Sequence, residues 1–155
     1  MSKIKTYRGL LTDGAQQKIN LKTNTGKMGY RIVKFQVMPQ NPGTSDYEHV
    51  VQIFTIPKTD PTVYGDIDFS DQNLLGVAFT KGDTSQGNPY DTAVIFDNVI
   101  FNQDIFVTHA DVKGALGANY HIELEQVKLN DNESTMATLQ SIRTKYEATT
   151  PAGPT

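Results

Sequence analysis

The chain has 155 residues, a formal net charge of −3, seven Phe and seven Tyr, and neither Cys nor Trp. This length is enough for one domain with a substantial core, and the lack of Cys excludes disulfides, thiolate metal sites and cysteine nucleophiles. The fourteen Lys and Arg residues are scattered, and no apolar stretch approaches the roughly 20 residues that cross a bilayer. We therefore expect neither a nucleic acid nor a membrane as a partner.

The N-terminal part predicts two strands and no secretion signal. The apolar core of MSKIKTYRGLLTDGAQ is only Gly-Leu-Leu, too short for the hydrophobic region of a signal peptide. Strands are predicted at residues 3–11 and 16–22. Asp13-Gly14 between them is a strong signal for a hairpin or a tight turn.

The next two predicted strands cover residues 30–38 and 47–56. In the first, Val33, Phe35 and Val37 are expected on one face, and the Pro-rich segment that follows ends the strand. In the second, apolar residues occupy both faces, which predicts burial on both sides or a bulge.

A long loop, about residues 57–73, precedes the last four predicted strands, at residues 74–80, 92–96, 105–109 and 119–129. Three Ile-Phe pairs lie five residues apart, at Ile95-Phe96, Ile100-Phe101 and Ile105-Phe106. This odd spacing suits neither an uninterrupted strand nor a helix, and the residues between the pairs are turn formers. We expect two strands joined by a short connection that keeps the pairs buried.

One segment near the C-terminus predicts a helix. Asn130 and Glu133 form a capping-box pattern, and apolar positions follow at helical spacing. These positions are Met136, Leu139, Ile142 or Arg143, and Tyr146. We expect an amphipathic helix of about four turns that packs on an open end of the sheets.

Together these elements predict an all-β fold, an antiparallel β-sandwich of the jelly-roll type with one short C-terminal amphipathic helix. An immunoglobulin-like sandwich is the alternative. Residues 1–147 are expected to form a single domain, and residues 148–155 a flexible polar tail.

Histidines and an acidic loop are the first candidates for a metal site. His49, His109 and His121 lie in or beside predicted strands without a partner at i+2 or i+4, which favours surface or interface histidines over zinc or iron ligands. The segment from Asp66 to Asp71 places oxygen ligands at alternate positions but lacks the glycine and the final glutamate of an EF-hand. Turn-capping aspartates are the preferred interpretation, with an irregular calcium site as the alternative.

Glu123 and Glu125 are the candidates for glycosidase chemistry because they share one strand face. They alternate with Tyr120, Ile122 and Leu124, however, so a solvated sheet face explains them fully. Nucleotide-binding and hydrolase motifs are absent from the sequence. The tyrosines do not cluster in the sequence, which favours a role in packing over a platform on which sugars stack. We therefore predict no catalytic, cofactor-binding or metal-binding residue.

Four segments together resemble small virion proteins of marine tailed bacteriophages. They are TYRGLLTDGAQ, GYRIVKFQVMPQNPGT, VIFDNVIFNQDIFVT and YHIELEQVKLNDNESTMATLQSIR, beginning at residues 6, 29, 94 and 120. The resemblance covers nearly the whole chain apart from the variable loops and the tail, and it contains no catalytic motif.

This resemblance implies a non-enzymatic structural protein, made in the cytoplasm of the infected host and assembled onto the virion. A capsid decoration or cement protein that binds the major capsid protein or other virion proteins is the preferred role, as a homo-oligomer with a trimer favoured. A tail or fibre component, a carbohydrate-binding module and a glycan lyase or hydrolase remain as alternatives.

Overall fold

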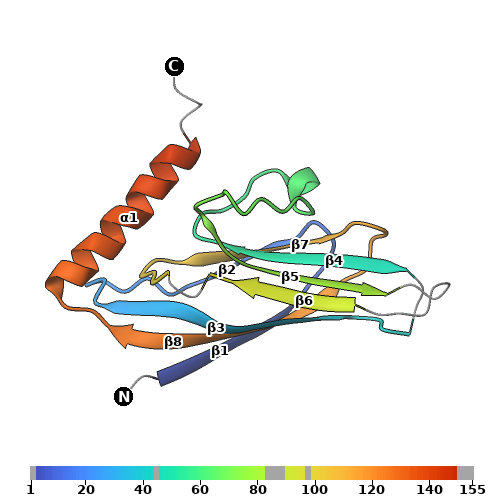
Figure 1. The fold of residues 1–155 in the computed structure, drawn as a ribbon, viewed down its shortest axis with the longest axis horizontal. Coiled ribbons are helices and arrows are strands. Elements are labelled where there is room, and N and C mark those ends of the chain that lie inside the picture. Colours follow the sequence, from blue (N-terminus) through green and yellow to red (C-terminus); the bar gives the residue numbers. More distant parts are fainter. Residues whose placement is uncertain (1–2, 44–45, 83–89, 97–98, 150–155) are drawn as a thin grey trace.

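The computed structural model describes residues 3–43, 46–82, 90–96 and 99–149, which form two antiparallel sheets and a C-terminal helix (Figure 1). The sheets pack face to face, so the predicted antiparallel β-sandwich is confirmed. The elements are β1 (Lys3–Leu11), β2 (Gln16–Ile19), β3 (Met28–Pro39), β4 (Tyr47–Phe54), η1 (Pro61–Val63), β5 (Leu74–Gly82), β6 (Tyr90–Ile95), β7 (Ile105–Asp111), β8 (Ala118–Lys128) and α1 (Asp131–Thr149).

The two sheets are unequal in width. One has the order β1-β8-β3, and the other has the order β2-β7-β4-β5-β6. The chain enters opposite sheets with β1 and β2 and returns through them with β7 and β8, which is the jelly-roll-like connectivity expected from the sequence. Strand β6 extends the wider sheet beyond β5.

The Asp13-Gly14 turn joins the two sheets. Strand β1 pairs with β8 and β2 pairs with β7, so the tight turn is confirmed and the hairpin interpretation is wrong. Gly14 has a φ of 79°, a conformation that a side chain disfavours, and its N–H donates to the carbonyl of His109 at 2.9 Å. The Asp13 carboxylate accepts from the N–H of Asp111 at 2.9 Å, so the turn is fixed against β7.

A bulge in β3 keeps its large apolar residues on one face. The pairing with β8 skips one residue between Ile32 and Lys34, which makes Val33 the extra residue. Ile32 and Phe35 are both buried, whereas Val33 is exposed. The prediction that Val33 and Phe35 share a face is wrong because the bulge resets the alternation of side chains.

The core between the sheets is built from alternate residues of the central strands. Ile122 and Leu124 of β8 are fully buried, as are Ile53 of β4 and Ile105 and Val107 of β7. Burying a side chain of this size contributes about 1.5–3 kcal/mol, so this cluster is the main stabilising element of the sandwich.

Strand β4 is buried on both faces, as its sequence predicts. Its second face carries Val50 and Phe54, which pack with Leu74 and Val77 of β5 into a smaller cluster. The loop of residues 55–73 lies over this face of the wider sheet (Figure 1). The register shift between Ile53 and Phe54 skips Leu75, so the bulge lies in β5, and burial on both faces is the alternative that holds for β4.

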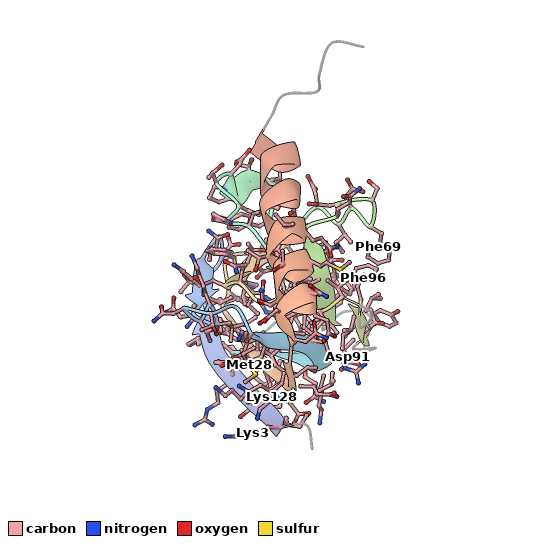
Figure 2. All side chains as sticks on the ribbon, turned by 90° about the vertical axis from the view of Figure 1, so that its left-hand side faces the viewer. Lys3, Met28, Phe69, Asp91, Phe96 and Lys128 are labelled. Atoms are coloured by element: carbon pink, nitrogen blue, oxygen red, sulfur yellow. The ribbon has the colours of Figure 1, made fainter. Side chains whose placement is uncertain are left out.

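Gln52 fastens this loop to the sheet. Its buried amide donates to the carbonyls of Tyr64 and Asp66, at 3.0 and 2.9 Å. On the same flank, the rings of Phe69 and Phe96 meet edge to face with centroids 5.5 Å apart, and Figure 2 shows the two side by side. The loop is therefore held by both polar and apolar contacts.

The Ile-Phe region connects β6 to β7 and runs along the edge of the narrower sheet. Phe101 and Tyr30 exchange backbone hydrogen bonds of 2.8 and 2.9 Å, which places this connection against the edge of β3. Phe101 and Ile105 are buried, but Ile100 is 39% exposed. The prediction of two strands joined by a connection is confirmed. The prediction that all three Ile-Phe pairs are buried is wrong. Residues 97–98, part of the predicted turn, lie outside the described residues.

Helix α1 begins with the predicted capping box. The Asn130 side chain accepts from the N–H of Glu133 at 2.8 Å, and the Glu133 carboxylate accepts from the N–H of Asn130 at 3.1 Å. The helix continues to Thr149, so it extends into the segment predicted as tail. The rest of that predicted tail, residues 150–155, lies outside the described residues.

The first turns of α1 dock through polar side chains. The Ser134 hydroxyl donates to the carbonyl of Gly26 at 2.9 Å, and the buried Asn102 amide donates to the Thr138 hydroxyl at 2.8 Å. Met136 and Leu139 are 71% and 58% exposed, so the prediction that they pack on the sheets is wrong. The surface under α1 presents a backbone carbonyl and an amide, which hydroxyl groups satisfy better than apolar side chains do.

Candidate functional site

A cleft of about 790 Å³ opens between the two sheets beside β6. One wall comes from β1, β3 and β8, and the other comes from β5 and β6. Clefts of this size hold small ligands or single side chains of a partner. It is therefore the first candidate for a binding site.

Small residues line both walls of this cleft. Gly9 has no side chain, and the Tyr120 ring lies across it, so a Cβ at position 9 would come 2.8 Å from the ring. On the other wall, Ala78 pairs with Ala93. Ala93 is exposed although its partner Ala78 is buried, which shows that the cleft is open to solvent at β6.

Tyr120 is the most polar buried group of the cleft. Its hydroxyl donates to the Gln17 side chain at 2.6 Å, and burial raises the pKa of Tyr120 above its usual range. The phenol therefore stays protonated at neutral pH, and its proton is already used in the hydrogen bond to Gln17. Among the lining residues that the structure describes, Asp91 is the one carboxylate, so the cleft wall holds no pair of acids for glycosidase chemistry.

Glu123 and Glu125 lie on the outer face of the narrower sheet, as the alternation predicts. Their neighbours Ile122 and Leu124 are fully buried on the opposite face. The Glu125 carboxylate pairs with the Arg31 guanidinium at 2.9 Å, where both side chains are partly solvated. The structure does not bring either glutamate into the cleft.

His49 and His109 form a buried pair, which the sequence did not predict. Both are 0% exposed, and Nδ1 of His49 lies 2.9 Å from Nε2 of His109. They sit on adjacent strands, with His109 opposite Val51 and His49 opposite Asp111. The expectation of surface histidines is wrong for these two, because facing strands bring together residues that are far apart in sequence.

The hydrogen bonds of the pair fix which nitrogens carry protons when both rings are neutral. Nδ1 of His109 lies 2.9 Å from the carbonyl of Thr12, which can only accept, so this nitrogen is the protonated one. Nε2 of His109 then accepts from Nδ1 of His49. Nε2 of His49 is left as a buried acceptor with no partner in the described part of the chain.

The surroundings of His49 disfavour an added proton on its ring. Burial lowers the pKa of His49, and His109 lowers it further, while Asp111 and Asp13 act in the opposite direction. Asp111 is itself occupied, because its carboxylate accepts from the backbone N–H of Glu48 at 3.1 Å and from that of Leu116 at 3.0 Å. The arrangement favours the neutral form of His49, and the hydrogen bonds of His109 and Asp13 fasten β7 to the Asp13-Gly14 turn.

The third histidine, His121, is partly exposed on β8 and faces Arg8 and Gln36 on the neighbouring strands. It is not near the buried pair in the register of the sheets, because it belongs to the other sheet. No group of three or more His, Asp or Glu side chains suited to a metal ion occurs among the described residues.

The aspartates of the long loop cap turns, as their preferred interpretation predicts. Asp68 accepts from the N–H and the hydroxyl of Ser70, and Asp71 accepts from Lys58 Nζ at 2.8 Å. These hydrogen bonds to Ser70 lower the pKa of Asp68. The carboxylates of Asp68 and Asp71 are thus bound to local partners.

Several apolar side chains are exposed on the outer surface. They include Met136 and Leu139 on α1, and Leu10 and Met38, which lie on either side of Asn119 in the narrower sheet. Exposed apolar groups that gather on one element often mark a contact with another protein. The sequence did not predict that Met136 and Leu139 are exposed, because their helical spacing suggested burial.

No helix in the described parts of the chain combines the length and the apolar character needed to cross a bilayer. Comparison of the chain with models of known protein families gives no match. Comparison with curated proteins likewise gives no match.

Proposed function

We propose that the chain is a non-enzymatic virion structural protein, a decoration or cement protein that binds the outer capsid lattice and stabilises it. The proposal starts from the resemblance of four sequence segments to small virion proteins of marine tailed bacteriophages. A β-sandwich with exposed apolar side chains on its outer surface is consistent with that role. The partner is then the major capsid protein or another virion protein.

The observation that carries the proposal is the mode of attachment of α1. Its polar side docks on the sandwich through Ser134 and Thr138, while Met136 and Leu139 face outward. In Figure 1 the helix projects away from one end of the sandwich. An apolar stripe on a projecting helix is suited to a groove on a neighbouring protein.

The first test locates the protein in purified particles and counts its copies. Hundreds of copies support the lattice position, whereas about six or twelve copies place the protein on the tail and contradict decoration. Absence from the particle contradicts a virion role altogether.

A second test asks whether α1 makes the contact. We expect the double substitution Met136→Lys and Leu139→Lys to reduce occupancy on the particle without changing thermal stability, because both side chains are exposed. Met38→Lys is the matched control, since Met38 is 66% exposed on a different surface. Equal occupancy of the two variants contradicts the role of α1.

The alternatives have less support in the described residues. A carbohydrate-binding module needs a cluster of exposed tyrosines, and among the tyrosine side chains that the structure describes only Tyr90 is largely exposed. A glycan hydrolase needs Glu123 or Glu125 near a second carboxylate in a cleft, and both lie on the outer sheet face. No specific observation favours either function over the structural role.

A further inference from the structure

The sandwich has four outer strands, and three of them carry features that discourage pairing with another chain. Strand β1 has Lys3 and Lys5, β2 is only four residues long and includes Lys18, and β3 has a bulge and ends at Pro39. Such devices blunt the edges of natural sheets. Strand β6 is regular and lacks Lys, Pro and a bulge, and Asp91, on its cleft-facing side, is its one charged residue.

The register of β6 shows which of its backbone groups point to the outer edge. The N–H of Phe96 donates to the carbonyl of Leu75 at 3.0 Å, and the pairing continues without a shift to Tyr90. In an antiparallel ladder alternate residues bond to the same neighbour, so Tyr90, Thr92 and Val94 face β5. The N–H and C=O groups of Asp91, Ala93 and Ile95 therefore point outward.

This outer edge is accessible. Tyr90 is 57% exposed, and the other β6 residues apart from Ile95 are exposed as well. Within the described part of the chain β6 pairs only with β5. Figure 2 places Asp91 on the flank of the molecule, on the same side as Phe96.

We propose that β6 pairs with β6 of a second copy of this chain, antiparallel and about a two-fold axis that passes beside Ala93. In this register Ala93 lies opposite Ala93 of the second copy, and Asp91 lies opposite Ile95. All outward N–H and C=O groups of the strand then find partners, because each pair is of the doubly hydrogen-bonded kind. The two five-stranded sheets become one continuous sheet.

The side chains of the outer face suit this register. On the outer face Thr92 lies opposite Val94 of the second copy, and Tyr90 lies opposite Phe96, which are favourable β-branched and aromatic pairs. The two Asp91 carboxylates are separated by the length of the paired segment, so like charges do not meet. On the inner face, Ile95 of the second copy lies next to Asp91, at the open side of the cleft.

A closed two-fold dimer follows from this pairing, because the same strand of each copy is used once. It differs from the trimer expected from the resemblance. The inference rests on the geometry of β6 and is independent of the proposed virion role, so a dimer in solution and a failure to find the protein in particles can occur together.

Cysteine cross-linking tests the register directly, since the chain contains no natural Cys. In the doubly bonded pair the two Ala93 Cα atoms lie about 5.5 Å apart, within the range that a disulfide spans. We expect Ala93→Cys to form a covalent dimer under mild oxidation at least about tenfold faster than Tyr90→Cys, whose Cα atoms are well beyond disulfide reach in this register. Equal rates for the two variants, or no cross-linked dimer with Ala93→Cys, overturn the proposal.

Sedimentation velocity of the full chain gives a second measurement. At about 100 μM, where an interface with a Kd of ~10 μM is mostly dimeric, we expect a dimer. Ala93→Pro removes an outward N–H without touching the ladder to β5, and we expect it to be monomeric. Ala93→Lys should act in the same way if the proline variant fails to fold, and Ile4→Lys on the exposed part of β1 is the control that should stay dimeric. A wild-type monomer or trimer, or a dimer that Ala93→Lys leaves intact, overturns the pairing.

Discussion

The buried histidine pair makes the stability of the fold depend on pH in a defined window. His49 has its pKa lowered from the ordinary value of 6.5, chiefly by burial and then by His109. The unfolded chain therefore binds a proton at a pH where the folded chain does not. The contribution of the neutral His49 to folding stability is fully present above about pH 6.5 and is lost as the pH falls toward the lowered pKa of His49.

The size of the effect follows from proton linkage. One proton taken up only by the unfolded state costs about 1.4 kcal/mol of stability for each pH unit. Between about pH 6.5 and 5.0, His49 can therefore account for a loss of at most about 2 kcal/mol. Asp104 and Asp111 have pKa values lowered from 3.8, because backbone N–H donors outweigh the effect of burial. The stability that these two carboxylates contribute is therefore lost only at lower pH.

The assay is urea unfolding at a series of pH values, with His49→Asn compared with wild type. Asn removes the titrating ring while its amide can still donate to Nε2 of His109. We expect the loss of stability on acidification to shrink in His49→Asn, whereas His121→Asn, at a partly exposed site, should follow wild type. Parallel pH profiles for wild type and His49→Asn would refute the reasoning, because they would show that His49 takes up no additional proton on unfolding.

Three substitutions test other contacts. Asn102→Ala removes the amide that donates to the carbonyl of Gly26 and to the hydroxyl of Thr138. We expect a loss of about 1–3 kcal/mol and faster hydrogen exchange in the first turns of α1, and unchanged exchange would contradict this anchor. Gln52→Leu removes both hydrogen bonds to the 55–73 loop, and we expect a similar loss of stability, with proteolysis in the loop increased before the rest of the chain is cut. Gly9→Ala places a methyl group against the Tyr120 ring, and calorimetry should show destabilisation of about 1–3 kcal/mol, whereas an unchanged midpoint would mean that the ring moves freely.

The strands could be predicted from the sequence because their signals are local. Alternating apolar residues and turn formers located all eight strands, and Asn130 with Glu133 located the start of α1. The pairing of strands is not local, and this explains the failure at Asp13-Gly14, where a hairpin signal turned out to connect two sheets.

The same limit applies to the candidate site. His49 and His109 are 60 residues apart in the chain and meet only because β4 and β7 are neighbours in the sheet. The exposed stripe of α1 was also beyond sequence reasoning, since Met136 and Leu139 have the spacing of a buried face. Which side of a helix docks depends on what the surface beneath it offers, and here that surface is polar.

The bulge in β3 has a consequence for how this fold can change in length. Ile32 and Phe35 both face the core although they are three positions apart, because Val33 is the inserted residue. A chain without Val33 would continue the regular ladder and keep Ile32, Lys34 and Phe35 on their present sides. Relatives one residue shorter at this position can therefore share the same core, and an alignment gap here indicates a conserved fold and not a shifted strand.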